Sequence, residues 1–192
     1  VSILYVNQVG GNDGLIFDGF SFGTSPDGSI FFEAPSFEEG VFEATLSFPG
    51  SNGRNITFEE EAYKSLVTGT RDYLRKLGFK KAHLGLSGGI DSALVACVAA
   101  DALGPENVVA FGLPGRYSSQ GSLNDAKALA FNLGIHFEVI SIEKPFEAYL
   151  ETLGGLWNGR FSGVAQENIQ ARIRGNYLMA YSNAATSMLL AT

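Results

Sequence analysis

The segment from Leu84 to Ser92 has the residue types and spacing of an anion-binding loop. Apolar residues up to Leu86 predict a strand, and a helix is expected to begin within the next few residues. The pair Gly88-Gly89 lets the backbone turn tightly and bring its N–H groups close to an anion. The new helix directs its dipole at the same point. The sequence therefore predicts a phosphate site at this strand end.

Three side chains of the loop support this interpretation. Ser87 and Ser92 supply hydroxyl donors, and Asp91 suits a divalent cation that bridges phosphates better than it suits bare phosphates. The alternative is a tight Gly-Gly turn after which Asp91 or Ser92 only caps the helix. A serine on each side and the strand–loop–helix context favour the phosphate site. The loop is neither the Walker loop, which needs Gly-Lys-Ser/Thr, nor the fingerprint Gly-x-Gly-x-x-Gly.

Residues 113–126 follow the second predicted strand and form a second polar segment. They read Leu-Pro-Gly-Arg-Tyr-Ser-Ser and, after two residues, Ser-Leu-Asn-Asp-Ala. In a doubly wound sheet this position lies at the carboxyl ends of the strands, where ligands bind. The structural alternative is a proline turn followed by a Ser122/Asp125 helix cap, and we expect that cap to form in either case.

A helix predicted around residues 166–177 has two different faces. Asn168, Arg172 and Asn176 recur at i, i+4 and i+8, and their amides and guanidinium suit ribose hydroxyls, phosphates and carboxylates. The alternative is a solvated face on which Gln170 and Arg174 support each other. The face expected to pack inward consists of Ile169, Ile173, Tyr177 and Ala180.

These segments together resemble one enzyme family. The loop 87–92 closely resembles the Ser-Gly-Gly-x-Asp-Ser pyrophosphate loop of the N-type ATP pyrophosphatases. Residues 167–175, Glu-Asn-Ile-Gln-Ala-Arg-Ile-Arg-Gly, resemble a signature of the glutamine-dependent NAD synthetases in that superfamily. Residues 113–119 are similar to the synthetase loop that meets the adenosine end of ATP, although many relatives have serine where this chain has Gly115. The likeness runs from about Tyr63 to Thr192.

The resemblance implies binding residues for ATP, for deamido-NAD and for Mg²⁺. The Mg²⁺ ligand would be Asp91, and the deamido-NAD residues would be Asn168 and Arg172. No side chain is implied as an essential nucleophile, so positioning and electrostatics would carry catalysis. The implied ATP-binding residues are Gly85, Leu86, Ser87, Gly88, Gly89, Ile90, Asp91, Ser92, Arg116 and Thr192.

The implied reaction is a ligation that forms NAD. Mg-ATP would adenylate the nicotinate carboxylate of deamido-NAD, and ammonia derived from glutamine would displace AMP. A homo-oligomer would form through the 164–184 helix. Two alternatives stay open: another amidotransferase with the same loop, such as GMP synthetase, or a non-catalytic nucleotide-binding fragment. The family's Glu, Lys and Cys glutaminase residues lie upstream, and its Gly-Asn-Lys-Ser-Glu segment lies beyond Thr192, so we expect the 192 residues alone to be inactive.

The elements that position these residues alternate between strand and helix. Thr57-Phe58-Glu59-Glu60 matches a capping box for a helix that Gly78 closes. Strands are then predicted at 82–86, 108–113, 136–142 and 188–192, and helices at 91–103 and 122–133, with Gly134 as a cap. Short apolar strands alternating with helices predict an α/β fold with a doubly wound parallel sheet, as in the Rossmann-like adenine nucleotide alpha hydrolase class to which the resemblance points.

The first 48 residues have a different pattern. Strands are predicted at 3–6, 15–17, 20–22, 29–32 and 41–48, with a proline turn at 25–28. This segment resembles the last strands of the nitrilase-like α/β-sandwich glutaminase domain that precedes the synthetase. The predicted organisation is a glutaminase remnant at 1–48, a linker at 49–56 and an ATP-binding synthetase domain at 57–192.

Composition limits the function classes. Apolar residues make up 45% of the 192 residues and charged residues 17%, which supports a packed core. A net charge of −7 disfavours nucleic acid as a partner. The single cysteine, Cys97, has an apolar setting typical of core packing and fits a reducing, cytoplasmic location. No apolar run is long enough for a membrane span.

Overall fold

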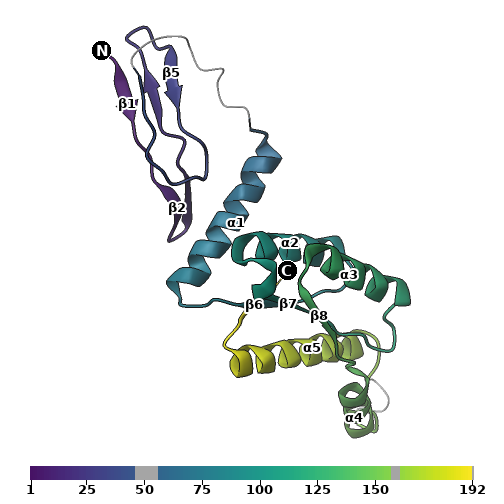
Figure 1. Cartoon of the computed structure of the whole chain (residues 1–192). Helices are drawn as coiled ribbons and strands as arrows, with labels where there is room; N and C mark the ends of the chain where they lie inside the picture. Colours follow the sequence, from purple (N-terminus) through teal and green to yellow (C-terminus); the bar gives the residue numbers. More distant parts are fainter. Residues whose placement is uncertain (46–55, 157–160, 192) are drawn as a thin grey trace. The chain divides into compact units, whose positions relative to one another are not determined.

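The computed structural model describes residues 1–45, 56–156 and 161–191, and its chain forms two compact units, Val1–Lys76 and Leu77–Thr192. Figure 1 shows the elements of both units. None of the helices in these ranges combines the length and the apolar character needed to span a bilayer.

The second unit is built on a parallel sheet, which confirms the predicted fold class. Its strands are β6 (Ala82–Gly85), β7 (Val108–Gly112), β8 (His136–Val139) and β9 (Met188–Leu190), in the order β8-β7-β6-β9. Helices α2 (Ile90–Leu103) and α3 (Gln120–Leu133) cover one face, and α5 (Val164–Ala185) covers the other (Figure 1). A short 3-10 helix (Pro105–Asn107) and α4 (Glu143–Leu153) complete the unit.

Small side chains let α2 lie close to the sheet. Ala96 and Ala99 are completely buried, and they pack with β6 and β7 residues such as Leu84 and Val108. Burying this apolar surface is the main favourable contribution to folding, at roughly 25 cal/mol per Å². The packed α2 fixes the position of its own N-terminus, where the predicted phosphate loop ends.

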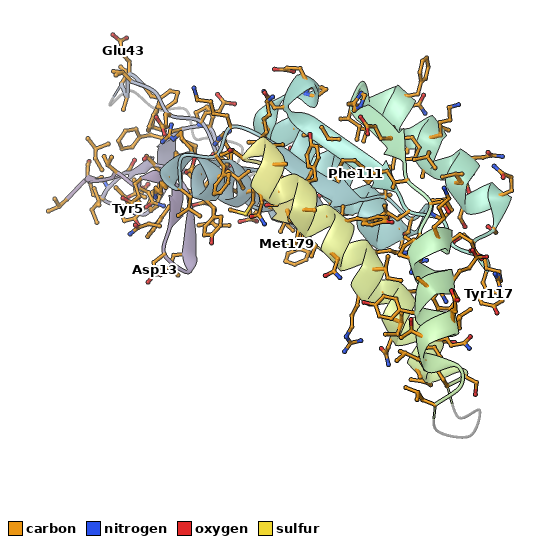
Figure 2. The ribbon with its side chains drawn as sticks, turned by 90° about the horizontal axis from the view of Figure 1, so that it is seen from below. Tyr5, Asp13, Glu43, Phe111, Tyr117 and Met179 are labelled. Carbon is orange, nitrogen blue, oxygen red and sulfur yellow. The ribbon has the colours of Figure 1, made fainter. Side chains whose placement is uncertain are left out.

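On the other face, an aromatic cluster and a buried histidine hold α5. Phe111 of β7 lies between the sheet and α5 (Figure 2), with its ring centroid 4.8 Å from that of Tyr181. His83 is completely buried; its Nε2 donates to the Leu178 carbonyl at 2.9 Å, so its Nδ1 accepts from the Ser187 hydroxyl at 3.0 Å. Both ring nitrogens are therefore satisfied, and burial lowers the pKa of His83.

Over its described residues, the first unit contains two small antiparallel sheets and one long helix. β1 (Ile3–Tyr5), β4 (Phe22–Thr24) and β5 (Ile30–Glu33) form one sheet in the order β1-β4-β5. β2 (Val9–Asn12) and β3 (Leu15–Asp18) form a hairpin with Asp13 at its tip (Figure 2). The helix is α1 (Phe58–Lys76). The Gly28 N–H donates to the Ser25 carbonyl at 2.9 Å, which confirms the predicted turn.

The β2–β3 hairpin packs on α1 through a glycine pair. The Gly11 N–H donates to Asp72 Oδ2 at 2.9 Å, and Lys76 Nζ donates to the Gly11 carbonyl. Gly10 has a φ of +122°, and a Cβ there would lie 2.6 Å from Asp72 Oδ2. Asp72 is only 7% exposed, and its carboxylate is paired with the Gly11 N–H and with Arg71 Nε at 3.6 Å. The predicted start of a synthetase domain at residue 57 stays a prediction, because α1 packs within the first unit.

Most predicted elements are present, with shifted ends. Glu60 N–H donates to Thr57 Oγ1 at 3.2 Å, which confirms the predicted cap of α1, and Gly134 caps α3 in the left-handed conformation. The predicted cap of α3 at Ser122 or Asp125 is wrong. Ser119 is the N-cap, because its Oγ accepts from the Ser122 N–H at 3.0 Å.

Two predicted strands need larger corrections. The strand predicted at 41–48 is absent over 41–45, where Val41 is fully exposed and no neighbouring strand supplies pairing partners; residues 46–48 lie outside the described range, as does most of the predicted linker. β8 ends at Val139 and not at residue 142, since Ile142 is the N-cap of α4. The sequence analysis missed α4, whose first turn tolerates Pro145 because those N–H groups have no helical acceptor.

Candidate functional site

The predicted phosphate loop lies between β6 and α2 and is held by its own serines. The Ser87 N–H donates to Ser92 Oγ at 3.2 Å, and the two hydroxyls are 3.0 Å apart. The Ser92 hydroxyl donates to the Gly89 carbonyl at 3.0 Å, and the Gly89 N–H donates to Ser87 Oγ at 3.2 Å. Ser92 is 5% exposed, so this closed set of hydrogen bonds fixes the loop from within.

Gly88 brings the loop against a second helix start. Its φ is +83°, and a Cβ built on it would lie 2.3 Å from the backbone carbonyl oxygen of Ser122. No residue with a side chain fits this position, since both the backbone angle and the space require glycine. The N-termini of α2 and α3 therefore meet at one point of the sheet edge.

Backbone donors at the start of α2 are available for an anion. Gly89 is the N-cap and supplies no side-chain acceptor, so the N–H groups of Ile90 and Asp91 in the first turn have no acceptor within the helix. The helix dipole adds positive potential there. Ile90 is 81% exposed, which leaves this helix start open to solvent.

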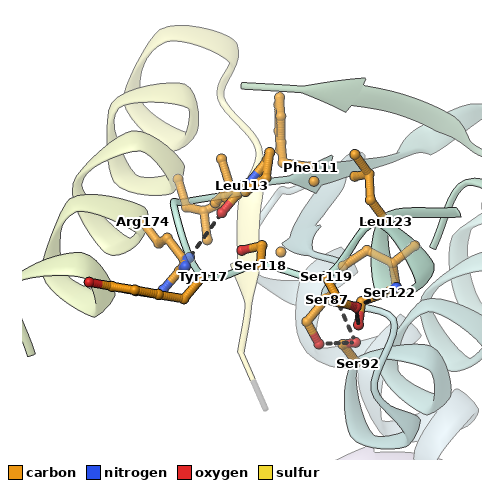
Figure 3. A pocket seen from close by; sticks show the side chains of 15 residues that line it. Ser87, Ser92, Phe111, Leu113, Tyr117, Ser118, Ser119, Ser122, Leu123 and Arg174 are labelled. Carbon is orange, nitrogen blue, oxygen red and sulfur yellow. Dashed lines mark hydrogen bonds between the residues drawn. The ribbon is translucent and has the colours of Figure 1, made fainter. Parts of the chain in front are cut away.

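A cleft of about 540 Å³ opens beside this loop (Figure 3). It lies at the carboxyl ends of β6 and β7, where the sheet order changes direction because β7 and β9 lie on opposite sides of β6. Apolar side chains from three elements and hydroxyls from the loops share its surface. Its lining residues are Gly85, Leu86, Ser87, Ser92, Phe111, Gly112, Leu113, Pro114, Tyr117, Ser118, Ser119, Ser122, Leu123, Arg174 and Leu178.

A second cavity of about 430 Å³ adjoins the first at α5. Tyr117, Ser118 and Arg174 line both, so these three residues mark the boundary between the cavities. The other lining residues of the second cavity are Gly163, Gln166, Glu167 and Gln170.

The structure brings only part of the predicted ATP set to the cleft. Gly85, Leu86, Ser87 and Ser92 line it, and Gly88 to Asp91 continue the same loop without lining the cleft. Asp91 is exposed at the start of α2. The described residues contain no group of three or more His, Cys, Asp or Glu that could hold a metal, so Mg²⁺ at Asp91 would need nucleotide oxygens as further ligands. Thr192 lies outside the described residues.

Arg116 lines neither cavity and is ion-paired instead. Its Nη2 lies 2.7 Å from Glu143 Oε1 and 3.1 Å from Glu147 Oε1, both on α4. The hydrogen bond and the charge of Glu143 raise the pKa of Arg116. To contact ATP, this side chain would have to exchange these carboxylates for phosphates.

The predicted deamido-NAD residues lie on the exposed side of α5. Asn168 and Arg172 are both exposed and line neither cavity, and Arg172 Nη1 donates to the Asn168 carbonyl at 3.2 Å. On the predicted inward face, Ile173 is buried and Ile169 and Tyr177 pack beside it, whereas Ala180 is exposed.

The sequence analysis missed several lining residues. Arg174 was considered only as a partner of Gln170, although it is two residues from Arg172 and so faces a different side of the helix. The serines at 118, 119 and 122 line the cleft within the second polar segment, at the strand end where the sequence predicted a ligand, although none of them was named as a binding residue.

The parallel sheet, the glycine loop and the cleft define a doubly wound α/β unit of the nucleotide-binding class. The NAD synthase family model matches residues 62–192, and the chain belongs to this family. A curated relative, the glutamine-dependent NAD(+) synthetase of Rhodobacter capsulatus, is 47% identical over 198 residues, covering 99% of this chain and 36% of the relative. The synthetase of the same name from Thermotoga maritima is 40% identical over 230 residues, covering 100% and 40%.

Solved structures show the same architecture. The glutamine-dependent NAD+ synthetase of Acinetobacter baumannii, in complex with ADP, matches with a TM-score of 0.89 and 39% identity over 100% of this chain and 38% of that one. The NH3-dependent NAD synthetase of Campylobacter jejuni matches with a TM-score of 0.62 and 29% identity over 70% of this chain and 56% of that one. The chain spans 36 to 40% of the length of the curated glutamine-dependent relatives named above.

Proposed function

We propose that the protein containing this chain is a ligase that forms NAD from deamido-NAD, ATP and ammonia supplied by glutamine. The observation that carries the proposal is the glycine-built loop at the end of β6. Its helix-start N–H groups face outward without helical acceptors, beside a cleft of about 540 Å³. Membership of the NAD synthase family and the ADP bound to the Acinetobacter baumannii relative support it.

In the proposed reaction, a carboxylate oxygen of deamido-NAD attacks the α-phosphorus of ATP, and the bond to pyrophosphate breaks. Ammonia then attacks the acyl carbon, AMP leaves, and the amide of NAD forms. The loop is held by its serine hydrogen bonds before the reaction begins, so its free N–H groups would stabilise the charge that develops on the departing pyrophosphate. Mg²⁺ bound between Asp91 and nucleotide oxygens would neutralise part of that charge.

We assign the remaining predicted residues in the same proposal. Asn168 and Arg172 bind deamido-NAD, and the 164–184 helix contributes to a homo-oligomer. The exposure of both side chains, and of Met179 on the same helix, supports a surface that is completed by other residues. Arg116 and Thr192 would contact ATP. A cytoplasmic location stays a prediction from the single cysteine.

The decisive variant in the full-length protein is Asp91→Asn. With deamido-NAD, Mg-ATP and excess ammonium, NAD formation should fall by about a hundredfold or more, because the metal-bridged phosphate charge is no longer neutralised. Asp125→Asn is the matched control, since Asp125 is an exposed α3 carboxylate that does not line the cleft. Near-normal turnover of Asp91→Asn would remove the proposed metal role.

The rival functions make different predictions. Another amidotransferase with this loop, such as GMP synthetase, would form AMP with a different acceptor and leave deamido-NAD unchanged. If the role is non-catalytic nucleotide binding, the full-length protein would bind ATP but would form no AMP. We expect the 192 residues alone to bind adenine nucleotide weakly and to make no NAD.

A further inference from the structure

The cleft has a strongly uneven distribution of charge. Among the described residues that line the cleft, Arg174 is the one with a formal charge, and the others are apolar side chains, hydroxyls and glycines. The chain as a whole has a net charge of −7. The positive charge of Arg174 is therefore a local exception to the acidic character of the chain, and it lies on the surface of a cleft that is open to ligands.

Arg174 is held in a fixed orientation that leaves most of its donors free. Its Nε donates to the Leu113 carbonyl at 3.0 Å, which ties the guanidinium to the end of β7. No described carboxylate forms an ion pair with it, whereas Arg116 has two glutamates and Arg172 donates to its own helix. The four N–H donors on the two Nη atoms remain for a ligand.

Burial makes these donors more effective. The side chain of Arg174 is partly buried, and burial lowers its pKa, although a guanidinium stays protonated at neutral pH. In such a setting a charge-assisted pair is screened less than on the surface. An oxyanion that occupies both Nη atoms would form two parallel hydrogen bonds.

Arg174 is also separate from the phosphate loop. Figure 3 shows it on α5, across the cleft from Ser87 and Ser92. It lines the second cavity as well, together with Tyr117 and Ser118. Glu167 lines that second cavity without pairing with Arg174, so an anion would approach from the first cavity or from the boundary between the two.

We propose that Arg174 forms a second oxyanion site, where the two cavities meet, that binds a carboxylate or phosphate group of a substrate. The identity of that substrate rests on the proposed function: the oxyanion is either the α-phosphate of the adenine nucleotide or the nicotinate carboxylate of deamido-NAD. With one end of the substrates at the loop and a second anion on Arg174, the reacting groups are held from two sides.

The test is a set of calorimetric binding measurements on the full-length protein. Arg174→Gln removes the charge, Arg174→Lys keeps the charge without the planar donor pair, and Lys127→Gln removes an exposed charge from α3 outside both cavities. The ligands are adenosine, AMP, ATP and deamido-NAD. Thermal unfolding of each variant reports whether the hydrogen bond to Leu113 is needed for folding.

If Arg174 binds the α-phosphate, Arg174→Gln lowers the affinity for AMP and for ATP by at least about tenfold and leaves the affinity for adenosine unchanged. If Arg174 binds the carboxylate, the affinity for deamido-NAD falls by a similar factor, and the affinity for AMP is unchanged. Arg174→Lys should recover part of either loss, and Lys127→Gln should bind all four ligands normally. If the Gln variant does not fold, equal affinities of the Lys variant and the wild type for AMP and deamido-NAD would refute the bidentate site.

Three further outcomes overturn the proposal. Unchanged affinities for all four ligands, or an equal loss for adenosine and AMP, would mean that Arg174 only anchors α5 to β7. Wild-type protein that binds neither AMP nor deamido-NAD would overturn the proposed function as well. Normal wild-type binding with an inert Arg174 would overturn this inference alone.

Discussion

Two glycine pairs in this chain make similar close approaches with opposite results. In the first unit, Gly10 and Gly11 of β2 meet Asp72 of α1, whose carboxylate accepts the Gly11 N–H at 2.9 Å. In the second unit, Gly88 meets the start of α3, where a Cβ on it would lie 2.3 Å from the Ser122 carbonyl oxygen, and Gly89 lies beside Ser87. In each pair one glycine, Gly10 or Gly88, brings the backbone closer than a residue with a side chain allows.

The two regions differ in which atoms accept the hydrogen bonds of the backbone N–H groups. At the hairpin, the Asp72 carboxylate accepts the hydrogen bond of the Gly11 N–H, and Asp72 is nearly buried. This N–H group is therefore not available to a ligand. At the loop the serines satisfy only part of the backbone, and the first-turn donors of α2 remain open beside a cleft. A glycine pair therefore indicates close approach, and only the remaining donors indicate a ligand.

Among the variants that test this comparison, Gly88→Ala should have the largest effect. The positive φ and the clash with a backbone carbonyl both oppose a side chain, so we expect the second unit to lose on the order of 3 kcal/mol of stability and to lose nucleotide binding. Chemical denaturation and ATP titration measure the two effects.

Gly121→Ala is the control for that variant. Gly121 lies in the first turn of α3, and the nearest atom to a Cβ there is Ser119 Oγ at 3.8 Å. Unchanged stability of Gly88→Ala relative to this control would show that the α2–α3 contact is not tight in solution.

Asp72→Ala tests the closed glycine contact. It leaves the Gly11 N–H without its acceptor, and hydrogen bonds to charged groups contribute about 1.5–3 kcal/mol, so the first unit should be destabilised by that amount. ATP affinity should not change, because the contact is complete within the first unit. Hydrogen exchange of the Gly11 amide gives the most direct measurement.

Glu60→Gln is the control on the same helix. Glu60 pairs with Lys64 at 2.8 Å on the exposed surface, where such pairs contribute about 0.3–0.5 kcal/mol. Equal effects of Asp72→Ala and Glu60→Gln would mean that the buried carboxylate is not important for the hairpin.

Ser92→Ala should have a smaller effect on stability and a clear effect on binding. The variant removes the acceptor for the Ser87 N–H and the donor to the Gly89 carbonyl, which we expect to cost about 1 kcal/mol. The loop then loses its fixed geometry, so ATP affinity should fall by more than stability alone explains. Unaltered ATP affinity would show that the serine pair does not organise the donors.

The periodic elements of the second unit could be predicted because local patterns and long-range packing agree there. Alternating apolar strands and helices gave the parallel sheet, and the glycine pair before Asp91 gave the loop. The strand predicted at 41–48 is absent over 41–45, because an extended segment needs a pairing partner, which the sequence around Val41 does not reveal. α4 was missed because Pro145 conceals a helix start.

The far side of the cleft could not be predicted from the same patterns. Arg174 reaches it through the rotation of α5 against the sheet, and that rotation depends on tertiary packing of Ile173 and Tyr181. Arg116 was expected at the ATP site, yet two glutamates on the unpredicted helix α4 hold it. Side-chain partners that lie 27 to 61 residues away in sequence leave no local signal.

The smallest effect concerns pH and separates the two units. Both histidines of the chain belong to the second unit, and burial lowers the pKa of His83 from its ordinary value of 6.5. The unfolded chain therefore binds a proton more readily than the folded unit, so the stability contributed by neutral His83 is present above pH 6.5 and is lost as the pH falls through the folded-state value. The second unit should consequently lose stability over this interval, and His83→Gln should remove part of the pH dependence. The comparison is made by following the denaturation of each unit between pH 7.5 and 5. If the second unit of the wild-type protein lost no stability in that range, a buried neutral imidazole between β6 and α5 would be contradicted.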